Sequence, residues 1–379
     1  MKRRWIFFVG AMSLMLMLLS PLQVAAADEW SSEVLLHEFN GTILDFDESR
    51  IVWKEAGDKK LWLFNRADES EVKVYDAAGP NDKIHSAKLS AEGVVLTISN
   101  TDPSGWPTYH SVYYWKDGNV QNLIEGSYPY GDVYDVKGNF AVFNNRVLDL
   151  ATGQSRSLPN SGFQNTNRFD LSADGTVVYT DPTYSSDLYK SLPDGTLTTH
   201  VLPNGYLSYG GPLTDGTNTI YRVLKRYSSG YKWLIRFRDA DDNITTLALN
   251  PFYGHFFNSR SGYQINNGWI AYSEYNKAND NLVLYVRSPE GEIKPIAETP
   301  PQSWKQSWYY RSSLTINQLG ADGSMVYTVY YGNLKYGKTF LYSAQSDTHL
   351  RVSGGPAEFR YLNGAWYRLA GNSLYAIQQ

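Results

Sequence analysis

Alternating apolar and polar positions recur along the chain, each time after a turn that ends in Gly or in an Asp-, Asn- or Glu-rich substitute. Alternation over four to eight residues between such turns is typical of half-buried β-strands. Asp-Gly and Asn-Gly turns favour hairpins because both residues tolerate positive φ. Beyond the first 27 residues no segment has a sustained helical period. The copies of this turn-and-strand phrase span residues 46–53, 89–96, 135–143, 171–179, 213–221, 265–272, 319–327 and 361–367.

The spacing of the copies, some tens of residues, indicates a repeat architecture. Each copy expands into four short strands, most clearly at 167–171, 176–180, 187–192 and 196–202. Four-stranded antiparallel units repeated in this way are the blades of a β-propeller. We therefore predict an all-β fold, a single β-propeller of eight four-stranded blades. Seven blades is the alternative, in which one copy is a decorated insertion.

The two ends of the chain predict how the ring closes. After the last copy begins, the chain supplies only three strands, at 357–362, 365–369 and 373–377. An additional strand at about 32–39 precedes the first copy. Three strands plus one complete an eighth blade, and closure removes the exposed edge strands of a linear stack.

Two of the turn phrases are "LSADGTVVY" (171–179) and "LGADGSMVY" (319–327), and two of the third-strand phrases are "LYKSLPDG" (188–195) and "LYVRSPEG" (284–291). Together they resemble the TolB-like (PD40-type) propeller repeat, and the resemblance covers most of the chain after its leader. It implies a propeller and a tendency to bind proteins or glycans, and it implies no reaction. The copies at 135–143 and 265–272 depart from the pattern because they lack the acidic residue before Gly.

The first residues predict a bacterial signal peptide. Three cations at 2–4 precede an apolar stretch at 5–19, and small residues offer a cleavage site after Ala27. The expected division is a signal peptide at 1–27 and a propeller at 28–379, with an uncleaved anchor helix as the alternative. We expect a secreted, extracytoplasmic protein with no integral membrane segment after cleavage. The chain has no Cys, which excludes disulfides, thiolate metal sites and an acylated-cysteine anchor.

The net charge and the aromatic content of the chain limit the classes of partner that it is expected to bind. The net charge is −4 and there is no basic run, so nucleic acid is not an expected partner. The 30 Tyr and 11 Trp suit strands, and they also suit sugar stacking and interfaces. Many stand in long segments expected on one face, in the second-to-third strand loops and blade-to-blade connections. The ligand-binding candidates on that face are Trp106, Tyr109, His110, Tyr184, Trp304, Trp308, Tyr309, Tyr310 and Arg311.

The interpretation that follows is a monomeric, non-catalytic binding propeller whose ligand is a glycan or a partner protein, with no cofactor. The alternative is a polysaccharide lyase or glycoside hydrolase on a propeller scaffold. For that alternative, Tyr253, His255 and Arg260 are the candidates for proton transfer and charge neutralisation. No pair of His has the spacing of zinc ligands. The oxygen-rich segment with Asn276, Asn279 and Asp280 is a calcium candidate that lacks a full ligand set.

Overall fold

The structure is a computed structural model of the whole chain. It describes residues 31–378, apart from 102–106, 128–134, 144, 160, 162–168, 182–186, 229, 250–261, 302–312, 332–336 and 354–356. The described residues include no helix long and apolar enough to cross a membrane.

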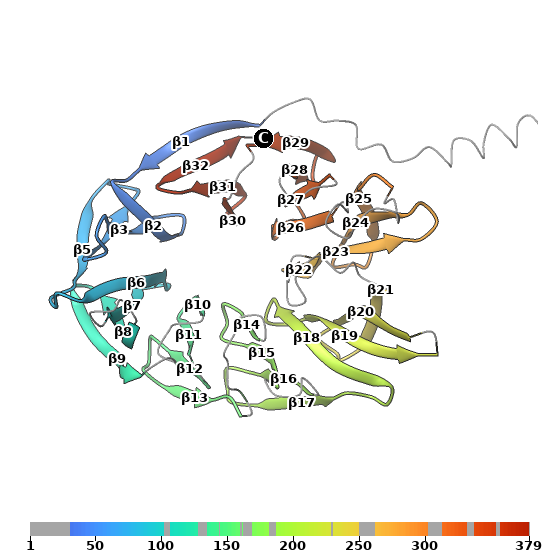
Figure 1. Cartoon of the computed structure of the whole chain (residues 1–379), viewed down its shortest axis with the longest axis horizontal. Helices are drawn as coiled ribbons and strands as arrows, with labels where there is room; N and C mark the ends of the chain where they lie inside the picture. The colour runs from blue at the N-terminus through green and yellow to red at the C-terminus, as the bar shows by residue number, and fades with distance from the viewer. Residues whose placement is uncertain are drawn as a thin grey trace, which may run out of the picture.

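Eight four-stranded antiparallel sheets are arranged as a ring around a central channel (Figure 1). This confirms the predicted eight-bladed propeller and excludes seven blades. Blades 1 to 3 consist of β2 (Gly41–Phe46), β3 (Arg50–Glu55), β4 (Lys60–Asn65) and β5 (Glu71–Asp76); β6 (Asp82–Leu89), β7 (Val94–Thr101), β8 (Pro107–Lys116) and β9 (Asn119–Ser127); and β10 (Asp135–Lys137), β11 (Phe140–Phe143), β12 (Arg146–Asp149) and β13 (Ser155–Ser157).

Blades 4 to 6 follow the same plan. They consist of β14 (Phe169–Leu171), β15 (Val177–Thr180), β16 (Asp187–Ser191) and β17 (Leu197–Val201); β18 (Tyr206–Thr214), β19 (Thr219–Tyr227), β20 (Gly230–Arg238) and β21 (Ile244–Leu249); and β22 (Tyr263–Asn266), β23 (Trp269–Asn276), β24 (Asn281–Arg287) and β25 (Ile293–Glu298). Blade 7 consists of β26 (Ser313–Leu319), β27 (Met325–Tyr330), β28 (Gly337–Ser343) and β29 (Thr348–Val352).

Blade 8 combines both ends of the chain. It contains β30 (Glu358–Leu362), β31 (Ala365–Ala370) and β32 (Ser373–Gln378), and its outermost strand is β1 (Ser32–Glu38). Strand β1 pairs antiparallel with β32, from Ser32 opposite Gln378 to Glu38 opposite Ser373. The predicted closure by the strand at 32–39 is thus confirmed.

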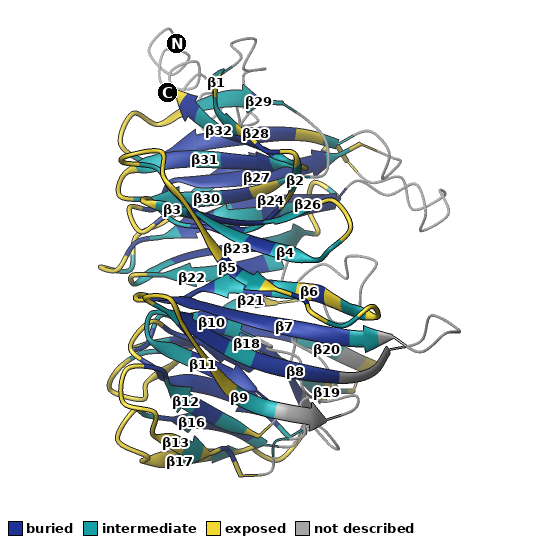
Figure 2. Cartoon of the chain, turned by 90° about the vertical axis from the view of Figure 1, so that its left-hand side faces the viewer, coloured by how far each residue is buried: buried dark blue, intermediate teal, exposed yellow. Residues whose placement is uncertain are grey.

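The core lies between neighbouring blades. Figure 2 shows buried residues, in dark blue, mainly along the strands and exposed residues, in yellow, mainly in the turns. In one interblade cluster, Val52 and Leu61 of blade 1 pack with Ile84 and Leu96 of blade 2, all of them at most 1 % exposed. Because each sheet buries both faces against its neighbours, the blades depend on one another for their core.

The first-to-second and third-to-fourth strand turns contain at most five residues each, as the repeated phrase predicts. Gly175 and Gly323 end two of these turns with φ of 88° and 85°, a conformation that favours glycine. The first strand of every blade therefore ends at the same side of the ring, which brings the residues before the turns together at one end of the channel.

Candidate functional site

Most of the candidates from the sequence lie outside the described residues. Among the ligand-binding candidates these are Trp106, Tyr184, Trp304, Trp308, Tyr309, Tyr310 and Arg311, and among the catalytic candidates Tyr253, His255 and Arg260. Tyr109 belongs to β8, but its side chain is also outside the description. The predicted long-loop site therefore stays a prediction.

Two candidates can be placed. His110 lies buried on β8 and its ring meets that of His85 edge-on, with the centroids 5.4 Å apart. The calcium candidate is the turn between β23 and β24. There the Asn276 side-chain oxygen accepts the Ala278 N–H, and Asp280 accepts the hydroxyl of Tyr275. These oxygens hold the turn together, and within the described ranges no three His, Asp or Glu residues are grouped as metal ligands would be.

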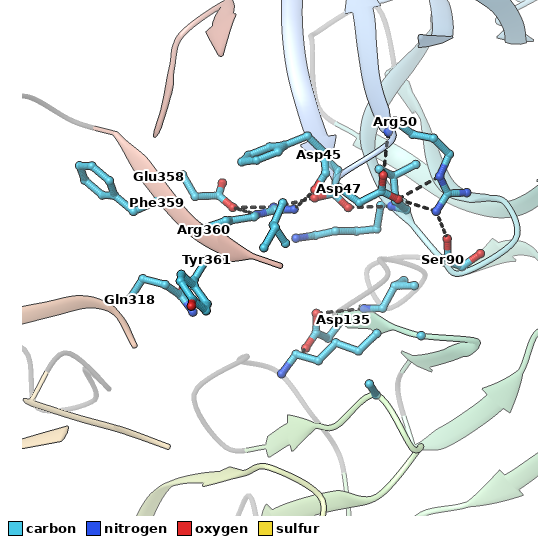
Figure 3. Close-up of a pocket in the computed structure, with 18 of the residues that line it drawn as sticks. Asp45, Asp47, Arg50, Ser90, Asp135, Gln318, Glu358, Phe359, Arg360 and Tyr361 are labelled. Atoms are coloured by element: carbon cyan, nitrogen blue, oxygen red, sulfur yellow. Dashed lines mark hydrogen bonds and ion pairs between the residues drawn. The ribbon is translucent and has the colours of Figure 1, made fainter. Parts of the chain in front are cut away.

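A cavity of about 900 Å³ occupies the central channel at the end where the first-to-second turns lie (Figure 3). Its walls come from the first strands of blades 1, 2, 3, 7 and 8 and from adjoining turn residues. The charged side chains that line it are the carboxylates Asp45, Asp47, Asp135 and Glu358 and the cations Arg50, Lys88, Lys137 and Arg360.

Arg360 of β30 and Asp45 of β2 link the last blade to the first. The Arg360 Nη2 atom lies 2.6 Å from Asp45 Oδ1 and 2.5 Å from Glu358 Oε1. Burial lowers the pKa of Arg360, but the carboxylates of Asp45 and Glu358 outweigh burial and raise it overall. This guanidinium is therefore held charged by its two carboxylate partners.

Asp45 also reaches the next blade. Its Oδ2 accepts the backbone N–H of Leu89 in β6 at 2.7 Å. The same contact recurs around the ring, where Asp170 accepts from Thr214 at 2.8 Å and Gln264 from Leu319 at 2.7 Å. A polar side chain on one first strand thus caps the first strand of the following blade. The buried carboxylates of Asp45 and Asp170 therefore stabilise the contact between neighbouring blades by satisfying buried backbone N–H groups.

Asp135 differs from these carboxylates. It begins β10, its side chain is 25 % exposed, and Figure 3 shows it at the cavity wall. Burial raises the pKa of Asp135 and the nearby Asp170 carboxylate adds to the increase, while Lys137 and Lys88 oppose it. Its Oδ2 lies 3.9 Å from Lys137 Nζ, and its Oδ1 accepts the backbone N–H of Val136. A carboxyl group with raised pKa in a cavity is suited to proton transfer.

The cations that line the cavity differ in the ion pairs that they form. Arg50 pairs with Asp47 at 2.6 Å and donates to the carbonyl of Ser90. Lys137 lies 3.1 Å from Asp170 as well as near Asp135. For Lys88 the described residues supply no ion pair, only the longer-range attraction to Asp135. Lys88 is thus the ammonium group most available to an anionic ligand.

Tyr361 adds a hydroxyl group to the wall. Burial, together with a hydrogen bond to Asp322, raises the pKa of Tyr361 to about 12. The hydroxyl therefore stays protonated at neutral pH. In Figure 3 its ring lies beside Gln318 of β26, across the channel from Asp135.

Sequence reasoning missed the channel residues because it looked for function where the repeat fails. A signal was present: charged residues stand within a few positions before or at the start of the turn phrases, in "ILDF", "AKLS", "DVKG" and "FRYL". In a propeller the first strand of each blade lines the channel. An alignment of the eight copies by their first strands places these charged residues near the ends of those strands, and so at the same end of the channel.

Comparisons with known proteins place the fold. No family model matches the chain, and no curated protein matches it. Among solved structures, the Porphyromonas gingivalis dipeptidyl peptidase 4 is similar with a TM-score of 0.54 and 11 % identity over 91 % of this chain and 56 % of that chain. An oligogalacturonate lyase in complex with manganese has 12 % identity over 93 % and 94 % of the two chains, with a TM-score of 0.41. A Mycobacterium tuberculosis puromycin-hydrolyzing peptidase has 10 % identity over 79 % and 45 %, with a TM-score of 0.36.

These similarities show the fold alone, and the chain spans little more than half the length of the dipeptidyl peptidase. The interpretation of the chain as a non-catalytic binding propeller is not supported, because the dipeptidyl peptidase that shares this fold is an enzyme, so the fold is compatible with catalysis. That interpretation rested on the aromatic residues expected on one face and on a repeat resemblance that implies no reaction. A propeller presents its chemistry from several blades, so a linear motif is not required.

Proposed function

We propose that this chain is an enzyme that cleaves an acidic polysaccharide by β-elimination, with the channel cavity as its reaction site. Asp135 carries the proposal, because its carboxyl group has a raised pKa, lies at a cavity wall and stands beside lysines. The volume of about 900 Å³ is within the usual size of small-molecule sites, roughly 300–1,000 Å³. The predicted signal peptide at 1–27 supports action outside a bacterial cytoplasm.

The reaction assigns a role to each group. Lys88, with Lys137 beside it, neutralises the carboxylate of a uronic acid residue and so acidifies the C5 proton. The Asp135 carboxylate takes that proton. The C5–H electron pair forms the C4–C5 double bond, and the bond from C4 to the glycosidic oxygen breaks. The departing oxygen takes a proton from water. A base with raised pKa is a stronger proton acceptor than an ordinary aspartate, and general base catalysis contributes about 10²–10⁴-fold in rate.

The test is a product assay over uronic-acid-containing and neutral polysaccharides. We expect unsaturated products, detected by ultraviolet absorbance, from acidic polymers only. Asp135→Asn should lower kcat by about 10²-fold or more. Because protonation inactivates the base, and the pKa of Asp135 is raised, the rate should increase with pH through a value above that of an exposed aspartate. Lys88→Gln should raise KM and lower kcat, because it weakens binding of the substrate carboxylate and leaves the C5 proton less acidic.

Asp117→Asn is the matched control, since Asp117 lies in the exposed β8–β9 turn at a positive φ that Asn also tolerates. It should keep full activity. Reducing ends without unsaturated products would replace elimination by glycoside hydrolysis. Full activity of Asp135→Asn, or no product from any polysaccharide, would overturn the proposal.

A further inference from the structure

Blade 5 carries a row of cations and aromatic rings that the channel chemistry does not use. Strands β18, β19 and β20 have nine residues each, and their long arrows extend from the ring at the lower right of Figure 1. Residues 206–238 contain six Lys or Arg and a single acidic residue, Asp215. Asp215 stands in the β18–β19 turn, at the opposite end of the blade from Lys225 and Lys232. Of these cations, Lys225, Arg226 and Lys232 stand near the β19–β20 turn, away from that carboxylate, in a chain of net negative charge.

The pairing of the strands puts these groups on one face. Lys225 of β19 stands directly opposite Lys232 of β20 and, on its other side, opposite Tyr206 of β18. Like charges directly opposite each other in a sheet are destabilising. None of the ion pairs found in the described part of the chain involves either lysine. A sequence that keeps such a pair without a carboxylate partner retains uncompensated charge for an anion to neutralise.

Aromatic rings hold the cations in place. The Lys225 ammonium lies 4.9 Å from the ring centroid of Tyr206 and 5.3 Å from that of Tyr227, and Lys232 lies 5.4 Å from Tyr227. The Arg236 guanidinium lies 4.6 Å from the Tyr206 centroid and donates to the Tyr206 hydroxyl. The order Lys232, Tyr227, Lys225, Tyr206, Arg236 forms a continuous row, which we call the cation–aromatic ladder. Cation–π contacts fix long side chains that would otherwise be free.

We infer that the cation–aromatic ladder is an accessory docking surface for a long acidic polysaccharide, which would hold the enzyme on its polymeric substrate. The identity of the ligand rests on the proposed function, while the surface itself is separate from the channel cavity. The cavity lies at the end of the blades that carries the first-to-second strand turns. The two lysines of the ladder lie near the β19–β20 turn, at the other end of blade 5. Charge complementarity favours a polyanion, and ordered cations bind one at a smaller entropic cost than free lysines.

The test compares the double variant Lys225→Gln/Lys232→Gln with Lys73→Gln/Lys116→Gln. The control pair lies on blades 1 and 2, is exposed and removes the same charge. Each protein is run by affinity electrophoresis through gels containing alginate, polygalacturonate or neutral dextran, at several salt concentrations. We expect the wild type and the control to be retarded by the two acidic polymers and not by dextran. The ladder variant should bind the acidic polymers about tenfold more weakly, with a shallower salt dependence.

Turnover separates this inference from the proposed function. If both hold, the ladder variant has a raised KM on long polymer, with unchanged kcat on short oligosaccharides, whereas Asp135→Asn binds polymer normally and does not cleave it. Binding to acidic polymer without any cleavage by the wild type would overturn the proposed enzyme activity and leave the ladder standing. Equal retardation of the ladder variant and the wild type, or an equal loss in the control, would overturn the ladder.

Discussion

At the scale of single residues, Asp45 joins three blades through its two carboxylate oxygens. It is 5 % exposed, one oxygen pairs with Arg360 of blade 8, and the other accepts from Leu89 of blade 2. Asp45→Ala should lower the free energy of unfolding by about 3 kcal/mol, because it leaves a buried N–H without its acceptor and a guanidinium short of a partner. Chemical denaturation measures the loss. Asp76→Ala, which removes an exposed ion pair with Lys73, should cost less than about 1 kcal/mol. Similar small losses for both variants would contradict this account.

At the residue scale, the contact partners and the pKa values of the channel side chains could not be predicted from the sequence. The strand that contains Asp45 and the turn after it could be predicted from alternation and turn chemistry. Its partner could not, because Arg360 stands near the other end of the chain and meets Asp45 only when eight blades close the ring. The raised pKa of Asp135 has the same origin, since burial by the assembled channel is its main cause. Local pattern specifies elements, while the environment of a charge is set by the closed ring.

At the scale of elements, the recurring Asp-Gly turn has a second reason for its glycine. Positive φ explains why Gly is favoured at 175 and 323. The structure adds an aromatic ring from the preceding blade. A Cβ at Gly175 would lie 2.8 Å from the ring of Phe140, and one at Gly323 would lie 2.5 Å from the ring of Trp269. The glycine of the turn phrase is thus required by packing between blades as well as by the geometry of the hairpin.

This packing can be measured with two matched turns. Gly323 and Gly195 both end Asp-Gly turns, with φ of 85° and 89°, but a Cβ at Gly195 would meet nothing within 4 Å. Each Gly→Ala change imposes the backbone strain of positive φ, roughly 1–2 kcal/mol. Gly323→Ala must also displace the indole of Trp269, which adds about 1–3 kcal/mol. The free energies of unfolding of the two variants, obtained from chemical denaturation, should differ by that amount, and equal values would mean that the interblade contact is loose.

At the scale of the whole molecule, the ring depends on β1. This strand covers the edge of β32, and Glu33 within it pairs with Arg368 at 2.5 Å, each side chain being 11 % exposed. It also reaches blade 7, since Ser353 donates its N–H to Glu33 and Ser31 donates to the carbonyl of Arg351. A chain starting at residue 39 would therefore lose its closing strand, a largely buried ion pair and two contacts with the neighbouring blade. It would also expose the row of backbone groups along β32.

We expect the chain that starts at residue 39 to unfold at a lower temperature than one that starts at 31 and to self-associate through the uncovered edge of β32. Thermal unfolding and light scattering of the two proteins measure these effects. A β1 peptide, residues 31–39, added in excess should reverse the association by restoring the edge, because pairing of backbone groups does not require a continuous chain. Glu33→Gln in the full-length chain tests the ion pair separately and should weaken the fold without causing association. If the shortened chain stayed monomeric and equally stable, closure would come from packing between blades 8 and 1 instead of strand pairing, and Asp45→Ala would then be the more damaging change.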